Sequence, residues 1–515
     1  MKMLSTFVAI VLGVNLVQSA RILGMIHIPS YSHQILFRPI WKELSLRGHQ
    51  VTVITSNPMN DSSLTNLTEI DVSGINKQWA EKNCFDYLHQ SFKELTEIVI
   101  EQNYVAVDYI LSNPHVNKLI KDKNEHFDLL MIEGFHSATV AFSERFKCPF
   151  ILMFSLDAIS FAYDEIGNPS HPVLHPDYML QYYGRLSFIE RLSSVFAQIY
   201  AHFINYHKTF PNQQFLIKKH FGEGYSPIQE LYRNYSMYFL NTNPVIHPIR
   251  PLLPNVIQIG GGTHLTTNTT LPEDLATTLN NCTFGAIYFS LGSNVKSNHI
   301  SSETRQAILE TFKELPYTVF WKFEDPNLPD KPSNVIISKW FPQQQILRHP
   351  NVKLFISQGG LQSLEEAIYG EVPILGIPIM GDQHTNIKGI VSKGYGLLLP
   401  YDSITKKNFK SAILDLMNNP RYHEKVKEIA NILKDQMHTG LELAIWWTEY
   451  VLRHKGTTHF RNPALDLPWY QNYLLDVFGF CLTALLVVLF VLYRITAFLS
   501  QLSKRICKIF KQKQM

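Results

Sequence analysis

The sequence predicts an α/β protein with two doubly wound parallel sheets and a C-terminal transmembrane helix. Buried-strand patterns alternate with helical patterns in two blocks of the chain, which is typical of parallel sheets with helices on both faces. A proline-rich stretch separates the blocks, and a nearly uncharged apolar stretch lies near the C-terminus. With 515 residues, of which 45% are hydrophobic and 17% charged, the chain can form two or three domains with sizeable cores.

Residues 1–20 have the pattern of a secretory signal peptide. Lys2 precedes an apolar run from Leu4 to Val14, and the small residues Ser19 and Ala20 offer a cleavage site. The alternative is a first membrane-spanning helix, for which this run is too short. We therefore expect a cleaved signal.

The first block, residues 21–245, is predicted to form a Rossmann-like domain. Between its first two strands we expect a loop that holds His33 and then a helix over 37–47, which together make a βαβ unit. Residues 176–215 hold ten aromatic residues with helical periodicity, which fits either a core or the wall of an apolar pocket. Strands are expected at 21–28, 49–55, 127–133 and 149–154.

The proline-rich segment 241–255 indicates an interdomain linker. The second block, residues 246–440, again alternates strand and helix patterns and is predicted to form a second Rossmann-like domain. Residues 441–472 would form a closing helix and a juxtamembrane segment. Strands are expected at 285–294, 318–323, 334–340, 352–357 and 372–379.

The apolar stretch near the C-terminus is long enough to cross a bilayer as a helix, and we place the span at 473–493. The tail, residues 494–515, carries six Lys or Arg residues and no acid, and positive charge beside a span marks the cytosolic side. A buried soluble helix, the alternative, does not explain these flanks. We therefore expect a single-pass type I protein with its main body in the secretory lumen.

Lys511 and Lys513 resemble the dilysine retrieval signal of endoplasmic-reticulum membrane proteins, and the alternative is a basic tail that contacts anionic lipid. Without Lys2 and the tail, the net charge falls from +3 to −4, which argues against a nucleic-acid surface. Cysteines outside the span and the tail allow one disulfide and have no metal-type spacing. Luminal placement predicts N-glycosylation at triplets that begin at Asn60, Asn66, Asn234, Asn268 and Asn281.

Ligands of open α/β sheets bind beyond the carboxyl ends of the strands. Gly359 and Gly360 follow a predicted strand, let a ligand approach the backbone, and precede a helix whose N-terminus is a natural diphosphate site. Glu366, about two turns into that helix, is well placed for a ribose diol. The alternative is a plain Gly-Gly turn with a solvated glutamate pair. Other loops at such strand ends are 290–294, 340–345 and 380–384.

The segment 340–383, "WFPQQQILRHPNVKLFISQGGLQSLEEAIYGEVPILGIPIMGDQ", resembles the signature of the UDP-glycosyltransferases of the animal endoplasmic reticulum, especially their insect members. "FSLGSNVKS", "RGHQVTVIT" and "AIWWTEYVLRHKG" also resemble that family. The resemblance covers essentially the whole chain and implies a GT-B fold, in which two Rossmann-like domains face a cleft. The N-terminal domain would take the acceptor, and the C-terminal domain would take the UDP-sugar, a co-substrate rather than a resident cofactor.

The resemblance also implies which residues contact the UDP-sugar. Trp340 would stack on the uracil, Gln343 would bond the uracil–ribose portion, and Glu366 would bind the ribose hydroxyls. The diphosphate would be held by Ser293, Gln358, Gly359, Gly360 and Gln362, and hydroxyls of the transferred sugar by Asp382 and Gln383.

Three glutamines depart from the family pattern. Gln358 replaces the usual histidine, Gln345 replaces an acid present in many members, and Gln362 replaces an asparagine. A glutamine can donate a hydrogen bond to a phosphate oxygen but adds no positive charge, which would weaken the stabilisation of the leaving group. We interpret these changes as tuning rather than loss of activity.

His33 corresponds to the catalytic base of the family, because it follows the first strand of the acceptor domain. Histidine titrates near neutral pH, which suits a general base. The alternative is a surface-loop histidine, one of 21 in the chain. The resemblance places Glu133 at the position of the acid that orients the base, and His136 is a rival polar group nearby.

We therefore expect an inverting, metal-independent transfer of a hexose, glucose by the likeness to insect members, to a hydroxyl of a small lipophilic acceptor. The alternative is a non-catalytic relative that binds or sequesters lipophilic molecules. A nicotinamide oxidoreductase is disfavoured, because no G-x-G-x-x-G follows the first strand. The pattern is also compatible with a homo-oligomer.

Overall fold

The structure is a computed structural model that describes residues 19–80, 82–266 and 270–512. The chain divides into two compact units, residues 1–460 (unit 1) and residues 461–515 (unit 2). The expected signal peptide up to residue 18, the triplet at Asn268 and the tail residue Lys513 lie outside the described residues. All five cysteines lie within the described part and are unpaired.

The first parallel sheet of unit 1 has the strand order β3-β2-β1-β4-β5-β6-β7. Its central strands β4 and β5 are buried throughout and apolar except for Glu133 at the end of β4, as expected for parallel strands covered on both faces. The strand order reverses between β1 and β4, and such a switch point opens a crevice at the carboxyl ends of these two strands. The strands are β1 (Arg21–Met25), β2 (Gln50–Thr55), β3 (Leu67–Asp71), β4 (Leu129–Glu133), β5 (Phe150–Phe154), β6 (Met237–Leu240) and β7 (Val256–Gln258).

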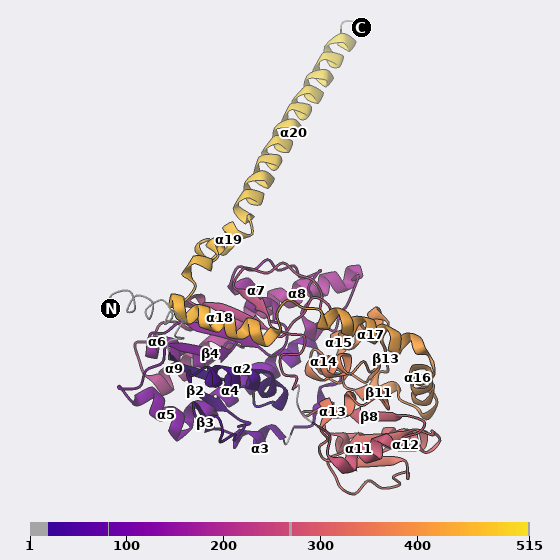
Figure 1. Cartoon of the computed structure of the whole chain (residues 1–515). Coiled ribbons are helices and arrows are strands. Elements are labelled where there is room, and N and C mark those ends of the chain that lie inside the picture. Colours follow the sequence, from indigo (N-terminus) through magenta and orange to yellow (C-terminus); the bar gives the residue numbers. More distant parts are fainter. Residues whose placement is uncertain (1–18, 81, 267–269, 513–515) are drawn as a thin grey trace, which may run out of the picture. The chain divides into compact units, whose positions relative to one another are not determined.

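The second parallel sheet has the order β10-β9-β8-β11-β12-β13, with its switch point between β8 and β11. Two apolar cores, one on each face, fix its helices. Figure 1 shows the two sheets with their helices as two lobes of unit 1, the first indigo to magenta and the second pink to orange. The strands are β8 (Ala286–Ser290), β9 (Thr318–Lys322), β10 (Val335–Ser338), β11 (Val352–Ser357), β12 (Ile374–Gly376) and β13 (Gly396–Leu398).

The expected linker 241–255 connects β6 and β7, which pair with each other in the first sheet. The chain therefore crosses to the second sheet only after Gln258, later than the expected boundary at residue 245. Residues 241–255 look like a linker in the sequence because their prolines exclude regular structure, but they form a loop within the first lobe.

The helices of the first lobe form where amphipathic segments follow capping residues. Ser91 and Glu94, for example, form a reciprocal capping box at the start of α4. The expected helix at 37–47 begins six residues earlier, at Tyr31, so His33 lies in its first turn rather than in a loop. The helices are α2 (Tyr31–Leu46), α3 (Ile75–Ala80), α4 (Phe92–Ser112), α5 (Pro114–Lys121), α6 (Ala141–Phe146), α7 (Ser160–Glu165), α8 (Phe188–Ile204), α9 (Phe210–Phe221) and α10 (Ile228–Arg233).

The last helix of unit 1, α18 (Gly440–His454), returns to the first sheet. Its buried residues Ala444, Ile445 and Val451 belong to the core that α2, β1 and β2 also form, so the C-terminal end of unit 1 closes the N-terminal lobe. The other helices of the second half are α11 (Glu273–Asn280), α12 (Ser302–Lys313), α13 (Gln343–Leu347), α14 (Leu361–Tyr369), α15 (Gln383–Lys393), α16 (Lys406–Asn418) and α17 (Pro420–Lys434).

Unit 2 contains α19 (Trp469–Asn472) and one long helix, α20 (Leu475–Gln512). Residues Leu475–Ile509 of α20 form a candidate membrane span by length and composition, and this helix is fully exposed in the chain. The expected span 473–493 is therefore helical from Leu475 onward, and the basic tail continues the same helix to Gln512.

Candidate active site

A cavity of about 400 Å³ lies between the two lobes of unit 1. Its wall includes Tyr31, Ser32 and His33 from the first lobe, which follow β1 at the switch point of the first sheet. From the second lobe, the turns after four strands and the first turns of the helices that follow them contribute Ser293, Trp340, Gln343, Gln358, Gly360, Gln362, Glu366, Asp382 and Gln383. The fold thus brings ten of the twelve expected site residues to one cavity, and Glu133 and Gly359 lie behind its wall.

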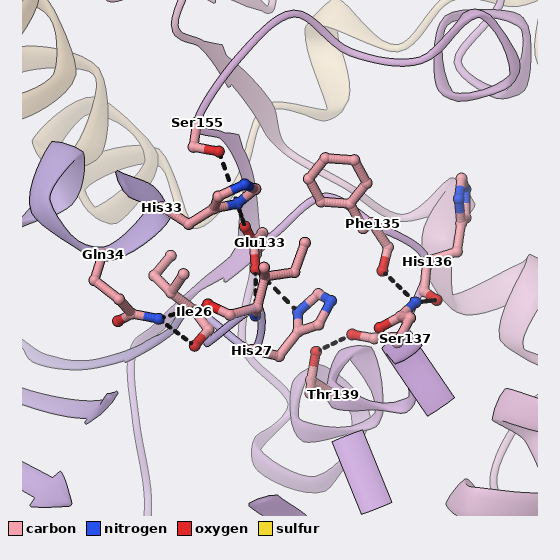
Figure 2. A network of polar contacts seen from close by, with 12 residues as sticks. Ile26, His27, His33, Gln34, Glu133, Phe135, His136, Ser137, Thr139 and Ser155 are labelled. Atoms are coloured by element: carbon pink, nitrogen blue, oxygen red, sulfur yellow. Dashed lines mark hydrogen bonds and ion pairs between the residues drawn. The ribbon is translucent and has the colours of Figure 1, made fainter. Parts of the chain in front are cut away.

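His33 is held by two side chains at the carboxyl ends of β4 and β5. Its Nδ1 lies 2.5 Å from Oε1 of Glu133 and 2.8 Å from Oγ of Ser155. Figure 2 shows the His33 ring between these two partners, with His27 on the other side of Glu133. Because both contacts are made by Nδ1, Nε2 is the ring nitrogen that remains for a ligand in the cavity.

Glu133 is fully buried, and its environment favours the ionised form. Burial alone would raise its pKa, but the charges of His33 and His27 and hydrogen bonds from His33 and the Ile28 amide outweigh burial and lower it. The Ile28 amide donates to Glu133 Oε2 over 2.9 Å. Burial lowers the pKa of His27, whose Nδ1 lies 3.5 Å from the same carboxylate. A buried carboxylate facing His33 Nδ1 fixes the orientation of the ring.

The two glycines after β11 have different roles. Gly359 has φ +93°, and a Cβ there would meet Ile387 Cγ1 of α15 at 2.6 Å, so both backbone and packing require glycine. Gly360 is the N-cap of α14 with φ −64°, and a Cβ there would meet nothing closer than 3.5 Å. Gly360 lines the cavity, which leaves the α14 N-terminus open to an anionic ligand.

Glu366 on α14 is part of a buried polar network at one end of the cavity. Gln343 Nε2 donates to Glu366 Oε2 over 2.6 Å, and Gln344 Nε2 donates to Oε1 over 3.2 Å. His264, from the segment that joins the lobes, lies 3.2 Å from Oε1 through its Nε2. Gln343, Gln344 and His264 therefore fix the orientation of the Glu366 carboxylate.

Trp340 gives the cavity an aromatic wall. Its side chain is 55% exposed, and Tyr31 of the first lobe meets it edge-on with ring centroids 5.1 Å apart. The Nζ of Lys322, at the end of β9, lies 5.8 Å from the Trp340 ring and donates to Glu324 over 2.6 Å. A planar base could stack on this exposed indole beside a cation.

Asp382 is the N-cap of α15 and Gln383 is its first residue, and both line the cavity. Burial raises the pKa of Asp382, which accepts a hydrogen bond from Asn386 over 2.7 Å. The side-chain oxygen of Gln383 accepts from the amides of Ile379 and Met380, which fixes the loop before the helix and leaves only its NH₂ group for a ligand.

Gln362, expected to contact the diphosphate, has its amide engaged across the cleft. Its Nε2 donates to the Ser155 carbonyl oxygen over 2.8 Å. Gln358 is buried, and its Oε1 has no hydrogen-bond partner among the described residues. The rival histidine, His136, contacts Glu165 rather than the His33–Glu133 pair.

Sequence reasoning missed four residues that shape this site: Ser155 beside His33, Lys322 beside Trp340, His264 beside Glu366, and Asn386, which bonds both Asp382 and the Gly359 carbonyl. Lys322 and Ser155 lie at the carboxyl ends of predicted strands, and this position alone could have marked them as candidate site residues. His264 carried no such signal, because its partners lie about 100 residues further along the chain.

Comparison with known proteins gives a consistent picture. A family model described as "UDP-glucoronosyl and UDP-glucosyl transferase" matches residues 24–509. The UDP-glycosyltransferase UGT5 of Dactylopius coccus is 33% identical over 95% of this chain and 93% of that protein. An ecdysteroid UDP-glucosyltransferase of Spodoptera littoralis nuclear polyhedrosis virus is 31% identical over 89% of this chain and 93% of that protein.

Solved structures share the fold at low sequence identity. The structure of TcCGT1 in complex with UDP covers 85% of this chain and 100% of its own, with a TM-score of 0.57 and 12% identity. The likeness places the two lobes in the GT-B architecture, in which two Rossmann-type domains face a cleft.

Proposed function

The chain belongs to the UDP-glucoronosyl and UDP-glucosyl transferase family and is a UDP-sugar transferase, and on this premise we propose that it transfers glucose to a hydroxyl of a small lipophilic acceptor with His33 as base. The observation that carries the proposal is that His33 contacts a buried carboxylate and faces the same cavity as Glu366 and Asp382. The proposed base and the proposed donor residues come from different lobes, as a reaction between two substrates requires.

In the proposed donor pose, the uracil stacks on Trp340 and Glu366 accepts hydrogen bonds from the ribose diol. The diphosphate lies at the N-terminus of α14, near Gly360 and Ser293. The sugar extends toward Asp382. Because Gln362 contacts Ser155 across the cleft, we propose that it closes the lobes around the diphosphate rather than serving only as a ligand.

The proposed step is a single displacement with inversion. Nε2 of His33 takes the proton of the acceptor hydroxyl, and the oxygen of that hydroxyl forms a bond to the anomeric carbon of the sugar. The bond from that carbon to the β-phosphate oxygen breaks, and UDP leaves toward the α14 N-terminus. The ionised Glu133 stabilises the imidazolium. Backbone amides and the helix dipole receive the leaving charge, so the proposed step needs no metal.

A small apolar cavity of about 80 Å³ beside the base supports a lipophilic acceptor. Its wall includes Phe135, whose ring centroid lies 6.0 Å from that of His33, and the adjoining His136. Aromatic and aliphatic side chains from α4 and α7 complete the wall: Phe92, Val99, Ile100 and Phe161. A relative named as an ecdysteroid transferase acts on an acceptor of this kind.

We also propose residence in the endoplasmic-reticulum membrane, with unit 1 in the lumen and α20 as the anchor. The one candidate span found within the described residues and the basic end of α20 support this orientation. Among the described residues, three of the triplet asparagines are exposed: Asn60, Asn234 and Asn281. The retrieval role of Lys511 and Lys513 stays a prediction.

The test is a His33→Ala variant of the full chain. We expect kcat to fall by roughly 10²- to 10⁴-fold with UDP-glucose and a phenol acceptor, while UDP affinity stays within about twofold. His89→Ala is a matched control, because His89 is exposed, lies outside the cavity wall and forms an ion pair with Asp402. If the His33 variant lost UDP binding together with transfer, the assignment of base and donor to separate lobes would be wrong.

Gln358 supports a second candidate, a non-catalytic binder of lipophilic molecules. Its neutral, buried side chain stands where most family members have a histidine, so no charge on it offsets the departing diphosphate. Failure to transfer from any UDP-sugar, with no protection by UDP against thermal unfolding, would favour this candidate.

A further inference from the structure

Unit 1 contains a second cavity between its lobes, of about 420 Å³, which the proposed step does not use. Its size suits a small organic ligand, whereas the small apolar cavity of about 80 Å³ cannot hold a whole acceptor. Leu156, Leu361 and Asp382 line both this second cavity and the candidate active site. Asp177 and Tyr178 line both it and the small apolar cavity. The three cavities are therefore direct neighbours.

The wall of this second cavity carries an excess of negative charge. Among the described residues, three carboxylates and one basic side chain line it: Asp157, Asp177, Asp382 and Arg250. Arg250 forms an ion pair with Asp157, with 2.7 Å between Nη2 and Oδ2. Burial lowers the pKa of both histidines in the wall, that of His247 to about 4, which disfavours their charged forms. The cavity is therefore better suited to a cationic ligand than to a neutral or anionic one.

Asp177 is a carboxylate for which the chain supplies no counter-ion of its own. Its Oδ1 accepts from the Met179 amide over 3.0 Å and caps η3 (Tyr178–Leu180), a short turn that an asparagine would cap equally well without a charge. The positive charge that acts on Asp177 is that of Arg250, which is already paired with Asp157. Burial raises the pKa of Asp177 to about 6. A buried carboxylate without a partner costs free energy, and a cationic ligand would remove that cost.

The surroundings of Asp177 suit an ammonium group attached to an apolar body. Tyr178 and Tyr183 line the second cavity, and aromatic rings of this kind attract a cation through their faces. In the small apolar cavity, Asp177 shares the wall with Phe135. The Phe135 ring lies beside His33, with ring centroids 6.0 Å apart (Figure 2). A molecule that starts at the base and passes Phe135 would therefore reach Asp177.

We propose that the acceptor is a hydroxylated lipophilic amine, whose ammonium group pairs with Asp177 while its hydroxyl faces His33. The inference rests on the proposed transfer function and names the acceptor class of the same site. The apolar body of the acceptor occupies the small apolar cavity, and the ammonium group lies where that cavity meets the second one. A neutral acceptor of the same shape leaves the carboxylate without a counter-ion and binds less tightly. Asp177 thereby determines specificity.

The test compares two phenols of similar shape, tyramine and 4-propylphenol, with UDP-glucose and the detergent-solubilised full chain. We expect kcat/KM to be about 10- to 100-fold higher for tyramine, and Asp177→Asn to remove this preference while 4-propylphenol keeps its kcat/KM within about threefold. Asp71→Asn is the matched control, because Asp71 Oδ1 also accepts from the amide two residues later but is exposed and outside these cavities. Equal kcat/KM for the two phenols, or a preference that survives in Asp177→Asn, would overturn the proposal.

Titration calorimetry with 2-phenylethylamine, which has the amine but no hydroxyl, tests the ion pair apart from catalysis. We expect binding to the unmodified chain that weakens by about 10-fold or more in Asp177→Asn and stays unchanged in Asp71→Asn. Equal binding to all three proteins, or binding to none of them, would contradict the pairing with Asp177. Lack of transfer to both phenols would instead contradict the proposed transfer function, and the calorimetry would still decide whether Asp177 binds an amine.

Discussion

At the scale of single residues, the proposed base depends on a carboxylate that water cannot reach. Glu133 is fully buried, and burial alone would raise its pKa, but two histidines and a backbone amide lower it, so the carboxylate stays ionised where a buried acid without such partners would be neutral. In the proposed mechanism, a buried carboxylate holds His33 in one tautomer and stabilises the positive charge that forms on its ring. Bulk water would have to reorient its dipoles to do the same.

Replacement of Glu133 separates this role from folding. We expect Glu133→Gln to reduce kcat by about 10²- to 10⁴-fold and to leave the affinity for UDP nearly unchanged, because the amide keeps the shape but not the charge. Glu133→Asp keeps the charge and should retain more activity than the Gln variant. Steady-state kinetics with UDP titration check this, and equal activity of the two variants would contradict an electrostatic role.

At the scale of elements, the turn from β11 into α14 shows how packing makes one of two adjacent glycines obligatory. Gly359 is confined by its positive φ and by the buried Ile387 of α15, whereas Gly360 has ordinary dihedrals and free space. The turn thereby fixes how α14, which carries Glu366, packs against α15, which follows Asp382, and both of these side chains line the cavity.

A pair of substitutions isolates that packing. Gly394 has a similar φ of +83°, but a Cβ there would meet nothing closer than 3.9 Å. We expect Gly394→Ala to cost about 1 kcal/mol from backbone strain alone. Gly359→Ala should cost about 2–4 kcal/mol, because overpacking adds to the strain, and it should also weaken UDP binding. Denaturant unfolding of the detergent-solubilised chain measures both, and equal losses would show that Ile387 yields at no cost.

At the scale of the whole molecule, the two lobes are joined by contacts that also belong to the site. Gln362 reaches Ser155, and Ser30 Oγ donates to Asn294 over 3.0 Å. His264, in the segment between the lobes, is buried between Glu365 and Glu366, with its Nδ1 3.4 Å from Glu365 Oε2. Burial lowers the pKa of His264, but the two carboxylates outweigh burial and raise it above 6.5.

The raised pKa predicts a dependence of stability on pH. The folded state binds the His264 proton more tightly than the unfolded state, so this stabilisation is complete below the model-peptide value of 6.5 and is lost as pH rises through the raised value. We expect the unfolding midpoint of the apo protein to fall above pH 6.5, and His264→Gln to flatten this fall. Thermal unfolding across pH checks it, and an unchanged slope in the variant would remove the contribution of His264.

Local signals in the sequence were sufficient for the overall organisation and for most of the site. The central strands were predicted because β4, β5, β8 and β11 are apolar runs that need burial on both faces. The strands β3, β6, β7 and β13 were missed, because they are short, and β3, β7 and β13 are only partly buried, so their own residues give a weak strand pattern. The site residues on turns after strands were predicted because topology places all such turns at one edge of a sheet.

The sequence by itself therefore determined two parallel sheets, a candidate span, and a set of polar turns that meet in a cleft. Tertiary structure alone decided that His33 lies in the first turn of a helix rather than in a loop, and that Ser155 and Glu133 both contact its Nδ1. It also decided that His264 contacts Glu366, the residue proposed to bind the ribose. It also decided that α8 carries its large apolar residues outward. The physical reason is range: strand and turn patterns arise from neighbours in the chain, whereas these contacts join residues about 100 or more positions apart, and only the packed fold fixes which side of a helix meets solvent.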